Sequence, residues 1–492
     1  MIELKGENEY IEYKKSNKKL SNDIWETYSA FANTFGGKII LGISEEQGKF
    51  IVTGVENPDN MISDFWVTIN NQQKISKNIL DNRCIQKILL NGKTCIEITV
   101  PEAHIEEKPI YLNDNLSKTY IRRFSSDQLA TNDEVASFMR NRSGNQDATT
   151  LDNYDIRDLN SVTISKYKDY LYQYTKDESI FDKSTSEFLT YIGAQTVDRN
   201  DGRKSKLTEA GLLFFGTEES IRSRFPHFHL DFFNRTGDTE RWIDRVSFGD
   251  LNYPNLNIFE FYLSVTEKLK ALLLEPFELT DNMTRKSTGK LQEALREACI
   301  NMLVHADYHN TLSTISINVY KMFYIFKNPG CLRVTKAAFV QGGQSNPRNN
   351  ILATLFRKIG LSERAGSGGP VIFSLQSEYD FRLPQIETTL NETELKIWTV
   401  EPINSIENID EESKMVYQVI VENPDITVSK LVEYTKFTRY RIYKIIEILE
   451  NNELIMHTGE TKNRKYQKSP STLDKFIDLD NMRKDIEKSI IN

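Results

Sequence analysis

The sequence predicts a multidomain protein of the α+β class. Its 492 residues are enough for about three or four domains of ordinary size. Hydrophobic residues make up 39% of the chain and aromatic residues 11%, which suffices for several separate cores. Strand-like alternation and helical periods are mixed along the chain. By composition it divides into blocks at 1–142, 152–282, 283–402 and 410–470, followed by a charged tail at 471–492 with enough apolar positions for one helix.

Charge and cysteine content narrow the function classes. The formal net charge of −8 gives no overall basic field, so a nucleic-acid site must be a local patch. The four cysteines, Cys84, Cys95, Cys299 and Cys331, lack metal-ligand spacing and fit a reducing cytosol. The N-terminus has no apolar core typical of a signal peptide, and no apolar run approaches the ~18 residues of a membrane span. We therefore expect a cytoplasmic protein without membrane contact.

The first block begins with a strand, a helix and a second strand. Residues 10–14 alternate so that Glu12 and Lys14 share one face of a strand. Residues 24–33 have the period of an amphipathic helix, which the glycine pair after it should end. Residues 38–43 form an apolar run typical of a buried strand. Further strands are expected at 95–100 and 119–123.

Three carboxylates and a lysine accompany this strand–helix–strand unit: Glu7, Glu12, Lys14 and Glu45. Metal-dependent cleavage of a phosphodiester needs carboxylates that hold Mg²⁺ or Mn²⁺ and a cation near the phosphate. The helix and its glycine turn can bring the end of the second strand, and hence Glu45, beside the first strand. A Glu and a Lys on one strand face, however, form a solvated ion pair more often than a catalytic site. The spacing leaves both interpretations open.

A longer string of residues resembles a known family. It consists of Glu-x4-Glu-x-Lys at 7–14, Ser-Ala-Phe-Ala-Asn-Thr-x-Gly-Gly at 29–37 and Gly-Ile-x-acidic at 42–45. Together these resemble the Schlafen core, also called the AlbA-like DNA-binding domain of prokaryotes, over roughly residues 3–139. The resemblance implies a Schlafen-core-like α/β domain that binds nucleic acid, DNA or RNA. Within the string, Asn33 and the glycine pair are expected to form the fold, since glycine permits close or left-handed backbone.

The resemblance also implies a cutting site. In nucleolytic Schlafen proteins, three acidic residues form the active site that cuts tRNA and rRNA. Carried over, these fall on Glu7, Glu12 and Glu45 as metal ligands, with Lys14 as the cation beside the nucleic acid. The third acid of the family is commonly Asp; here it is Glu45, whose carboxylate reaches further by one methylene. Many prokaryotic relatives are regarded as binding nucleic acid only.

The second and third blocks are expected to differ in role. The second, 152–282, is a mixed scaffold domain, in which 206–216 form an apolar helix that ends on glycine. In the third, 283–402, a helical period places Glu297 and Asn301 four residues apart on one face. There an Asn can ligate a Mg²⁺ that bridges nucleotide phosphates while a Glu positions a water molecule. A hydrogen-bonded surface pair is the more common alternative.

Elements downstream favour the nucleotide. A Phe-Lys-Asn-Pro-Gly turn at 326–330 follows a strand-like region, and a glycine-rich loop at 361–370 precedes an apolar helix, which suits a phosphate on backbone N–H groups. The ordered set resembles the Bergerat-fold (GHKL-type) ATP-binding module, an α/β sandwich, in the divergent form paired with AlbA-like domains. The resemblance implies ATP bound by Glu297, Asn301, Asn328, Gly330, Gly366 and Gly368, with Mg²⁺ at Asn301.

One position departs from typical Bergerat ATPases, in which an Asp reads the adenine amino group. This chain has Asn328 there. An Asn carbonyl oxygen can accept the same hydrogen bond, but as a neutral acceptor. We therefore expect nucleotide binding, with at most weak hydrolysis. The helix is followed by His-Ala-Asp-Tyr as in the family, and His305 and Asp307 are expected to be structural.

The fourth block contains two helical segments, 427–435 and 438–450, which are separated by a short turn with Thr438 as N-cap. Residues 454–466 are typical of a β-wing with a basic tip. Together these segments resemble the winged helix-turn-helix domains of bacterial regulators. The resemblance implies a helix in a groove and phosphate contacts at the wing. Winged helices that serve in dimerisation are the alternative. The residues expected at the nucleic acid are Lys14 of the first block and Arg439, Arg441, Lys444, Lys462, Arg464 and Lys465.

These motifs favour one function and leave a second open. The favoured function is an ATP-responsive nucleic-acid-binding protein, a prokaryotic transcriptional regulator or defence factor. The alternative is a metal-dependent Schlafen-type endoribonuclease gated by nucleotide. A scaffold with both modules degenerate is a third interpretation, against which three separate motif sets argue. A homodimer is implied by the resemblance, because eukaryotic Schlafen cores join two similar lobes and this chain holds one.

Overall fold

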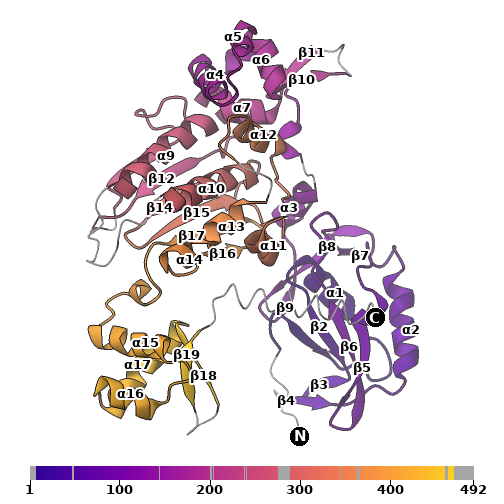
Figure 1. Ribbon diagram of the computed structural model, residues 1–492. Helices are drawn as coiled ribbons and strands as arrows, with labels where there is room; N and C mark the ends of the chain where they lie inside the picture. The colour runs from indigo at the N-terminus through magenta and orange to yellow at the C-terminus, as the bar shows by residue number, and fades with distance from the viewer. Residues whose placement is uncertain are drawn as a thin grey trace. The chain divides into compact units, whose positions relative to one another are not determined.

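The computed structural model describes residues 7–46, 49–142, 145–199, 202, 204–237, 239, 241–274, 289–343, 345–362, 366–459 and 464–469. The chain forms two compact units, Met1–Gly144 (unit 1) and Asn145–Asn492 (unit 2). Several sheets and helices in them make the protein α+β, as the sequence predicts (Figure 1). None of the helices in these ranges is long and apolar enough to cross a membrane. The predicted contact residue Lys462 and the predicted tail helix at 471–492 lie outside the described residues.

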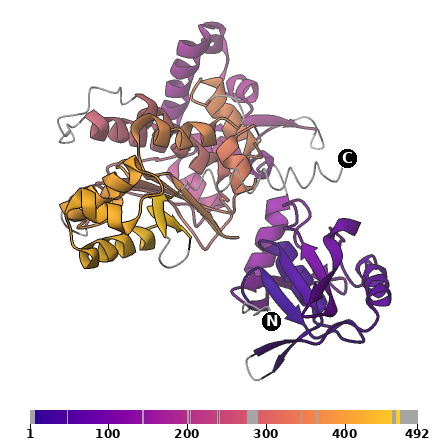
Figure 2. The same ribbon diagram turned by 60° about the horizontal axis from the view of Figure 1, so that its bottom comes forward.

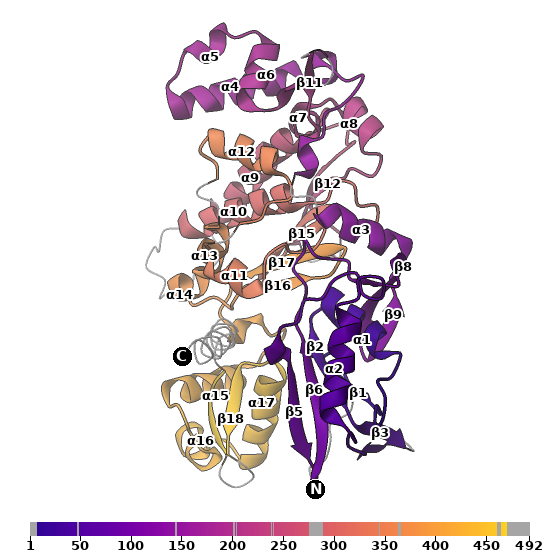
Figure 3. The same cartoon turned by 90° about the vertical axis from the view of Figure 1, so that its right-hand side faces the viewer.

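Unit 1 is built on a four-stranded sheet of order β1-β2-β6-β5, in which β1 and β2 are parallel and the other neighbours antiparallel. Helices α1 and α2 pack on the face of this sheet that carries Ile39 and Ile98 (Figure 3). Its elements are β1 (Ile11–Lys14), α1 (Ile24–Asn33), β2 (Gly37–Leu41), β3 (Ile43–Glu46), β4 (Lys49–Val52), α2 (Pro58–Ile69), β5 (Ile85–Leu90), β6 (Lys93–Val100), β7 (Tyr111–Leu112), β8 (Asn115–Arg123), β9 (Ser126–Leu129) and α3 (Asn132–Arg142).

The motif that contains Asn33 and the glycine pair holds unit 1 together. Asn33 Nδ2 donates to the carbonyl oxygens of Ile110 and Tyr120 at 2.8 and 2.9 Å, and its Oδ1 accepts from the Ile110 N–H. Gly36 has a φ of +74°, and a Cβ on Gly37 would lie 2.8 Å from ring atoms of Phe31. These positions therefore serve the fold, in agreement with the prediction.

Unit 2 has a longer series of elements before its C-terminal module. They are α4 (Ser161–Thr175), α5 (Ser179–Asp182), α6 (Thr185–Ile192), β10 (Gln195–Asp198), β11 (Lys204–Leu207), α7 (Glu209–Phe215), α8 (Glu218–Arg224), β12 (Leu230–Asn234), β13 (Asp244–Ser247), α9 (Ile258–Leu274), α10 (Gly289–His305), β14 (Ile315–Val319), β15 (Phe323–Pro329), α11 (Lys336–Gln341), α12 (Asn350–Lys358), α13 (Gly368–Phe373), α14 (Leu375–Tyr379), β16 (Gln385–Thr388) and β17 (Glu392–Trp398).

A six-stranded sheet of order β13-β12-β14-β15-β17-β16 organises these elements. Helices α9 and α10 lie together over it (Figure 1). Strands β12 and β13 come from the block expected to be scaffold, and β14 to β17 from the block expected to bind ATP. The predicted boundary between 282 and 283 thus falls within one sheet and one hydrophobic core. The apolar run predicted at 206–216 supplies α7, all of whose residues are buried.

The last described elements of unit 2 form a small module with its own core. Three helices, α15 (Glu411–Glu422), α16 (Val428–Thr435) and α17 (Arg439–Asn451), precede a hairpin of β18 (Ile455–Thr458) and β19 (Lys465–Lys468), drawn orange to yellow in Figure 2. Ile420, Leu431 and Ile445 are buried in it. Thr438 caps α17, as predicted, because its Oγ1 accepts from the Arg441 N–H at 3.3 Å.

Candidate functional sites

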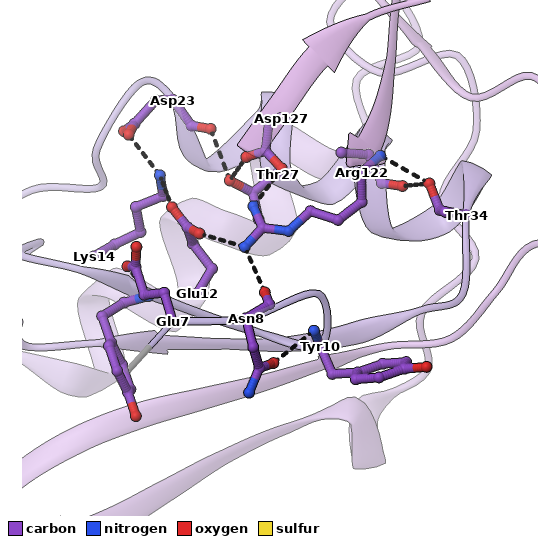
Figure 4. A network of polar contacts seen from close by, with 12 residues as sticks. Glu7, Asn8, Tyr10, Glu12, Lys14, Asp23, Thr27, Thr34, Arg122 and Asp127 are labelled. Carbon is purple, nitrogen blue, oxygen red and sulfur yellow. Dashed lines mark hydrogen bonds and ion pairs between the residues drawn. The ribbon is translucent and has the colours of Figure 1, made fainter. Parts of the chain in front are cut away.

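Arg122 on β8 is the centre of a buried polar network in unit 1 (Figure 4). Its guanidinium donates to Glu12 Oε2 at 2.8 Å, to Asp127 Oδ1 at 2.7 Å and to the carbonyl oxygen of Asn8 at 2.8 Å. It also lies over the Phe31 ring, 5.0 Å from the ring centroid. Two carboxylates and a cation–π contact therefore hold one guanidinium in place.

Lys14 extends the same network from the other side of Glu12. Its Nζ donates to Glu12 Oε1 at 2.8 Å and to Asp23 Oδ2 at 2.7 Å, while Thr27 Oγ1 donates to Asp127 at 2.5 Å. Burial lowers the pKa of Lys14, but the hydrogen bonds to Asp23 and Glu12 outweigh it, so the pKa is raised overall. Both oxygens of Glu12 are thus already bound to cations of the protein.

The other two predicted carboxylates have different surroundings. Glu7 Oε1 accepts from the Tyr13 N–H at 3.0 Å, and burial raises the pKa of Glu7. Glu45 is exposed on the β3–β4 hairpin, opposite Phe50. Among the residues that the structure describes, no group of three or more His, Cys, Asp or Glu side chains is arranged to hold a metal ion. The donor set of unit 1 therefore does not fit the divalent metal that the Schlafen resemblance implies.

Sequence reasoning missed Arg122, Asp127 and Asp23 in this network. Residues 119–123 were expected to form a strand, which β8 confirms. A charged residue in that strand was the available signal, because a buried Arg requires an acidic partner. Its partner Glu12 lies 110 residues away in the sequence, so only the folded chain identifies the pair.

A cavity of about 320 Å³ in unit 2 brings together the residues predicted to bind ATP. Of the six, Glu297, Asn301, Asn328, Gly366 and Gly368 line it. Gly330 is adjacent: it has a φ of +93°, and its carbonyl oxygen accepts from Oγ1 of the lining residue Thr393 at 2.8 Å.

One end of the cavity is formed by the last residues of β15 and the turn that follows them. Asn328 is buried, and its Nδ2 donates to the Pro329 carbonyl oxygen at 3.0 Å, which leaves Oδ1 as the acceptor for a ligand. Apolar side chains on three strands also line the cavity, namely Phe326, Ile386 and Leu395. This end can hold a flat apolar ring with a hydrogen-bond donor at its edge.

A second part of the cavity is formed where α13 meets α10. A Cβ on Gly368 would lie 2.4 Å from Asn301 Nδ2 and 2.8 Å from Glu297 Oε1, so only glycine allows this approach. Gly366 has a φ of +87°, and its carbonyl oxygen accepts from the Gly343 N–H at 3.2 Å. An amide, a carboxylate and glycine backbone thus face the same space.

Arg348 supports the Asn-Pro-Gly turn from behind, and sequence reasoning missed it. It is fully buried and donates to the carbonyl oxygens of His305 and, at 3.2 Å, Cys331. A Cβ on Gly330 would lie 2.7 Å from its guanidinium. Burial, with smaller effects of Arg348 and Arg333, lowers the pKa of His305 to about 3, so this imidazole is neutral at pH 7.

The predicted nucleic-acid contacts in the C-terminal module are not equally available. Arg441 Nε donates to Glu412 Oε2 at 2.6 Å, and Arg441 also pairs with Asp410. Arg439 Nη2 donates to Ser429 Oγ at 3.1 Å, and Lys444 Nζ lies 4.8 Å from the centroid of the exposed Tyr440 ring. Arg464 and Lys465 are exposed.

Comparisons with known proteins match three parts of the chain. Residues 7–131 match the family model Schlafen, AlbA_2. The resemblance expected from the sequence is thereby confirmed for this part. Residues 313–397 match the HATPase_c_4 model, described as "Putative ATP-dependent DNA helicase recG C-terminal", and 136–231 match a domain of unknown function, DUF8451.

Solved structures add no further detail. The crystal structure of the DIP2311 protein from Corynebacterium diphtheriae is 14% identical, with 94% of this chain and 95% of that chain covered and a TM-score of 0.39. The solution NMR structure of the N-terminal domain of a "Putative ATP-dependent DNA Helicase RecG-related Protein" from Nitrosomonas europaea is 28% identical, covers 25% of this chain and 82% of that chain, and has a TM-score of 0.20. No curated protein matches the sequence.

Proposed function

We propose that this protein binds ATP in the cavity of unit 2 and nucleic acid elsewhere, and that nucleotide occupancy controls nucleic-acid binding. The observation that carries the proposal is the convergence of Glu297, Asn301, Asn328, Gly366 and Gly368 on one cavity. Its volume of about 320 Å³ lies in the range of about 300–1,000 Å³ that small-molecule sites occupy. The matches at 7–131 and 313–397 support both parts of the proposal.

The cavity suits the parts of ATP in a definite order. Asn328 Oδ1 accepts from the exocyclic amino group of adenine, and the apolar strand residues contact the ring. The phosphates lie at Gly366 and Gly368, whose backbone permits close approach. Mg²⁺ bound with the nucleotide would be held by Asn301 and Glu297, where it would neutralise phosphate charge.

Nucleic acid is assigned to two modules. The first is the Schlafen-core-like domain at 1–142. The second is the C-terminal module at 410–470, which we interpret as a winged helix-turn-helix that contacts phosphates with Arg439, Lys444, Arg464 and Lys465. A homodimer acting in transcription or defence is the corresponding biological proposal. Arg441 contributes least, because two carboxylates already bind it.

Thermal unfolding with and without ATP-Mg²⁺ tests the cavity. We expect ATP to raise the thermal midpoint of the full chain, since a ligand of the native state stabilises it by mass action. Asn301→Ala and Asn328→Ala should lose this rise. An equal ATP-induced rise in the midpoint for wild type and Asn301→Ala at saturating ATP-Mg²⁺ would refute the site.

Thiol modification gives a second test of the same cavity. In a Cys84→Ser background, Cys331 is the remaining partly exposed thiol of the described residues, and it lines the cavity. ATP should therefore slow the modification of Cys331.

Cleavage of nucleic acid has less support, because the carboxylates of unit 1 do not fit a divalent metal. The test is incubation with tRNA, rRNA and DNA, with Mg²⁺ or Mn²⁺ and with or without ATP. Glu12→Ala removes a buried ion-pair partner, so Glu45→Gln is the better variant for this test, because Glu45 is exposed. Metal-dependent cleavage that Glu45→Gln abolishes would reinstate the nuclease; binding without cleavage is the expected result.

A further inference from the structure

The charged side chains that line the unit 2 cavity favour an anion. Among the described lining residues there is one carboxylate, Glu297, and there are two guanidinium groups, Arg333 and Arg357. His305 also lines the cavity but is neutral. One negative and two positive charges leave the lining with a net charge of +1. A lining with this net charge attracts an anionic ligand, and the two guanidinium groups outweigh the one carboxylate.

Arg357 is placed to meet that ligand by the face that α12 turns toward the cavity. Asn350, Ala353, Thr354 and Arg357 line it, at positions i, i+3, i+4 and i+7 of the helix. This spacing puts the four residues on one stripe. Ala353 keeps the stripe shallow in the middle, and Arg357 is the charged residue at its C-terminal end.

Arg357 lies in the C-terminal turn of α12, which in the sequence is followed by the glycine-rich loop. The helix starts beside the C-terminal end of α10, since Asn349 Nδ2 donates to the carbonyl oxygens of Val304 and Ala306 at 2.9 and 2.7 Å. After its last turn, Ser362 and Gly366 line the cavity again. Arg357 therefore lines the same cavity as Gly366 and Gly368, where the phosphates are proposed to lie.

Arg357 also differs from the other two arginines around the cavity. Arg348 is fully buried and its guanidinium is bound to backbone carbonyl oxygens, and Arg333 is buried next to the Asn-Pro-Gly turn. Arg357 is exposed, and its Nη2 donates to the neutral Thr354 Oγ1 at 3.0 Å. A neutral hydroxyl positions the guanidinium without cancelling its charge, and a phosphate can replace it as the acceptor.

We infer that Arg357 binds the terminal phosphates of the nucleotide and makes the cavity select di- and triphosphates over nucleosides. This inference rests on the proposed ATP site and adds a specificity residue to it. Because the contact is made to the phosphates, removing Arg357 should weaken binding in proportion to phosphate number. Removing Asn328, which faces the base, should weaken all adenine ligands alike.

The test measures the affinities of adenosine, AMP, ADP and ATP-Mg²⁺ for the full chain by calorimetry. For Arg357→Ala we expect ATP to bind about 10- to 100-fold more weakly, the usual range for a hydrogen bond to a charged group, with adenosine within about twofold of wild type. Arg357→Lys should recover part of the loss. Arg157→Ala, an exposed arginine of unit 2 outside the cavity lining, is the control and should leave all four affinities unchanged.

The outcomes separate this inference from the proposed function. If wild type binds ATP and Arg357→Ala binds it equally well, the inference is wrong and the ATP site stands. The inference is equally wrong if Arg357→Ala weakens adenosine as much as ATP. If wild type binds none of the four ligands, the ATP site itself is wrong. Inorganic tripolyphosphate gives an independent readout: it should compete with ATP in wild type and lose this effect in Arg357→Ala.

Discussion

Two of the motif-bearing regions of this chain use their charged residues in opposite ways. In unit 1, Glu12 pairs with both Lys14 and the buried Arg122, so its charge is satisfied within the protein. In unit 2, Glu297 and Asn301 line a cavity of about 320 Å³ together with the glycines of a distant loop. The first arrangement stabilises a fold, and the second leaves room for a ligand. A motif alone does not distinguish the two cases, whereas burial and partners do.

The largest effect is expected from breaking the unit 1 network. Arg122→Ala removes the cation from one oxygen of the buried Glu12 and from the partly buried Asp127, and such a loss costs about 3–5 kcal/mol of unfolding free energy. The neighbouring Arg123→Ala removes a partly exposed pair with Glu134 and should cost about 1 kcal/mol or less.

Urea unfolding, with hydrogen exchange of α1 and β8 to locate the change in unit 1, measures the difference between these variants. ATP binding by unit 2 should be unaltered in both. Similar costs for Arg122→Ala and Arg123→Ala would show that the network does not stabilise the fold, and would return Glu12 to the candidates for a functional site.

Sequence reasoning succeeded where local pattern decides the structure. The helix predicted at 24–33 is α1, because its apolar spacing and the Gly36 turn are both local signals. The strand predicted at 38–43 is shorter, since Gly42 with a φ of +95° separates β2 from β3. A glycine inside an apolar run was the signal for this break.

Reasoning from sequence failed where distant residues meet. Arg348 reaches the carbonyl oxygen of His305 across 43 positions, and Arg122 reaches Glu12 across 110. No periodicity links residues so far apart. Five of the six residues predicted to bind ATP nevertheless line one cavity. The family pattern places Asn301, Asn328 and Gly368 in one site although they lie far apart in the sequence.

A second contrast concerns buried carboxylates. Glu12 is bound by cations, whereas Asp147 of unit 2 is held by backbone: its Oδ2 accepts from the Leu352 N–H at 2.8 Å, at the start of α12. Its Oδ1 has no hydrogen-bond partner among the residues that the structure describes. Burial, with a smaller contribution from Glu209, raises the pKa of Asp147 from 3.8 to about 6. A raised acid pKa means that the folded chain binds the proton more tightly than the unfolded chain.

The stability contributed by Asp147 is therefore fully present below about pH 4 and is lost as pH rises through 6. The shift corresponds to on the order of 3 kcal/mol. Asp147→Asn should remove this dependence, so the difference in unfolding free energy between variant and wild type should change between pH 5 and pH 7.5. Asp152→Asn, an exposed control, should show no such change. A constant difference for Asp147→Asn would mean that the carboxylate is already ionised at pH 5.

The close approach at Gly368 is the point at which the cavity is easiest to disturb. Gly368→Ala puts a methyl group against Asn301 and Glu297, and overpacking of this kind costs about 1–3 kcal/mol. We expect ATP affinity to fall by at least about tenfold, since the two polar groups must move. Gly193→Ala is the control: its Cβ meets open space, although its φ of +91° is strained, so stability should fall slightly and ATP affinity should not. Unchanged ATP affinity in Gly368→Ala would mean that Asn301 does not contact the nucleotide.

The smallest effects are expected in the C-terminal module, where the contrast between satisfied and available charges recurs on one helix. Arg441 is bound by Asp410 and Glu412, whereas Lys444 faces only the Tyr440 ring and solvent among its described contacts. Lys444→Ala should lower nucleic-acid affinity uniformly across sequences and reduce the salt slope by about 1. Arg441→Ala should leave the slope nearly unchanged.

Fluorescence anisotropy of labelled duplex DNA and RNA at several salt concentrations measures the affinity and the salt slope of both variants. Equal slopes for the two variants would mean that Arg441 exchanges its carboxylates for phosphates on binding, and that pairing within the free protein does not determine which cations reach the nucleic acid.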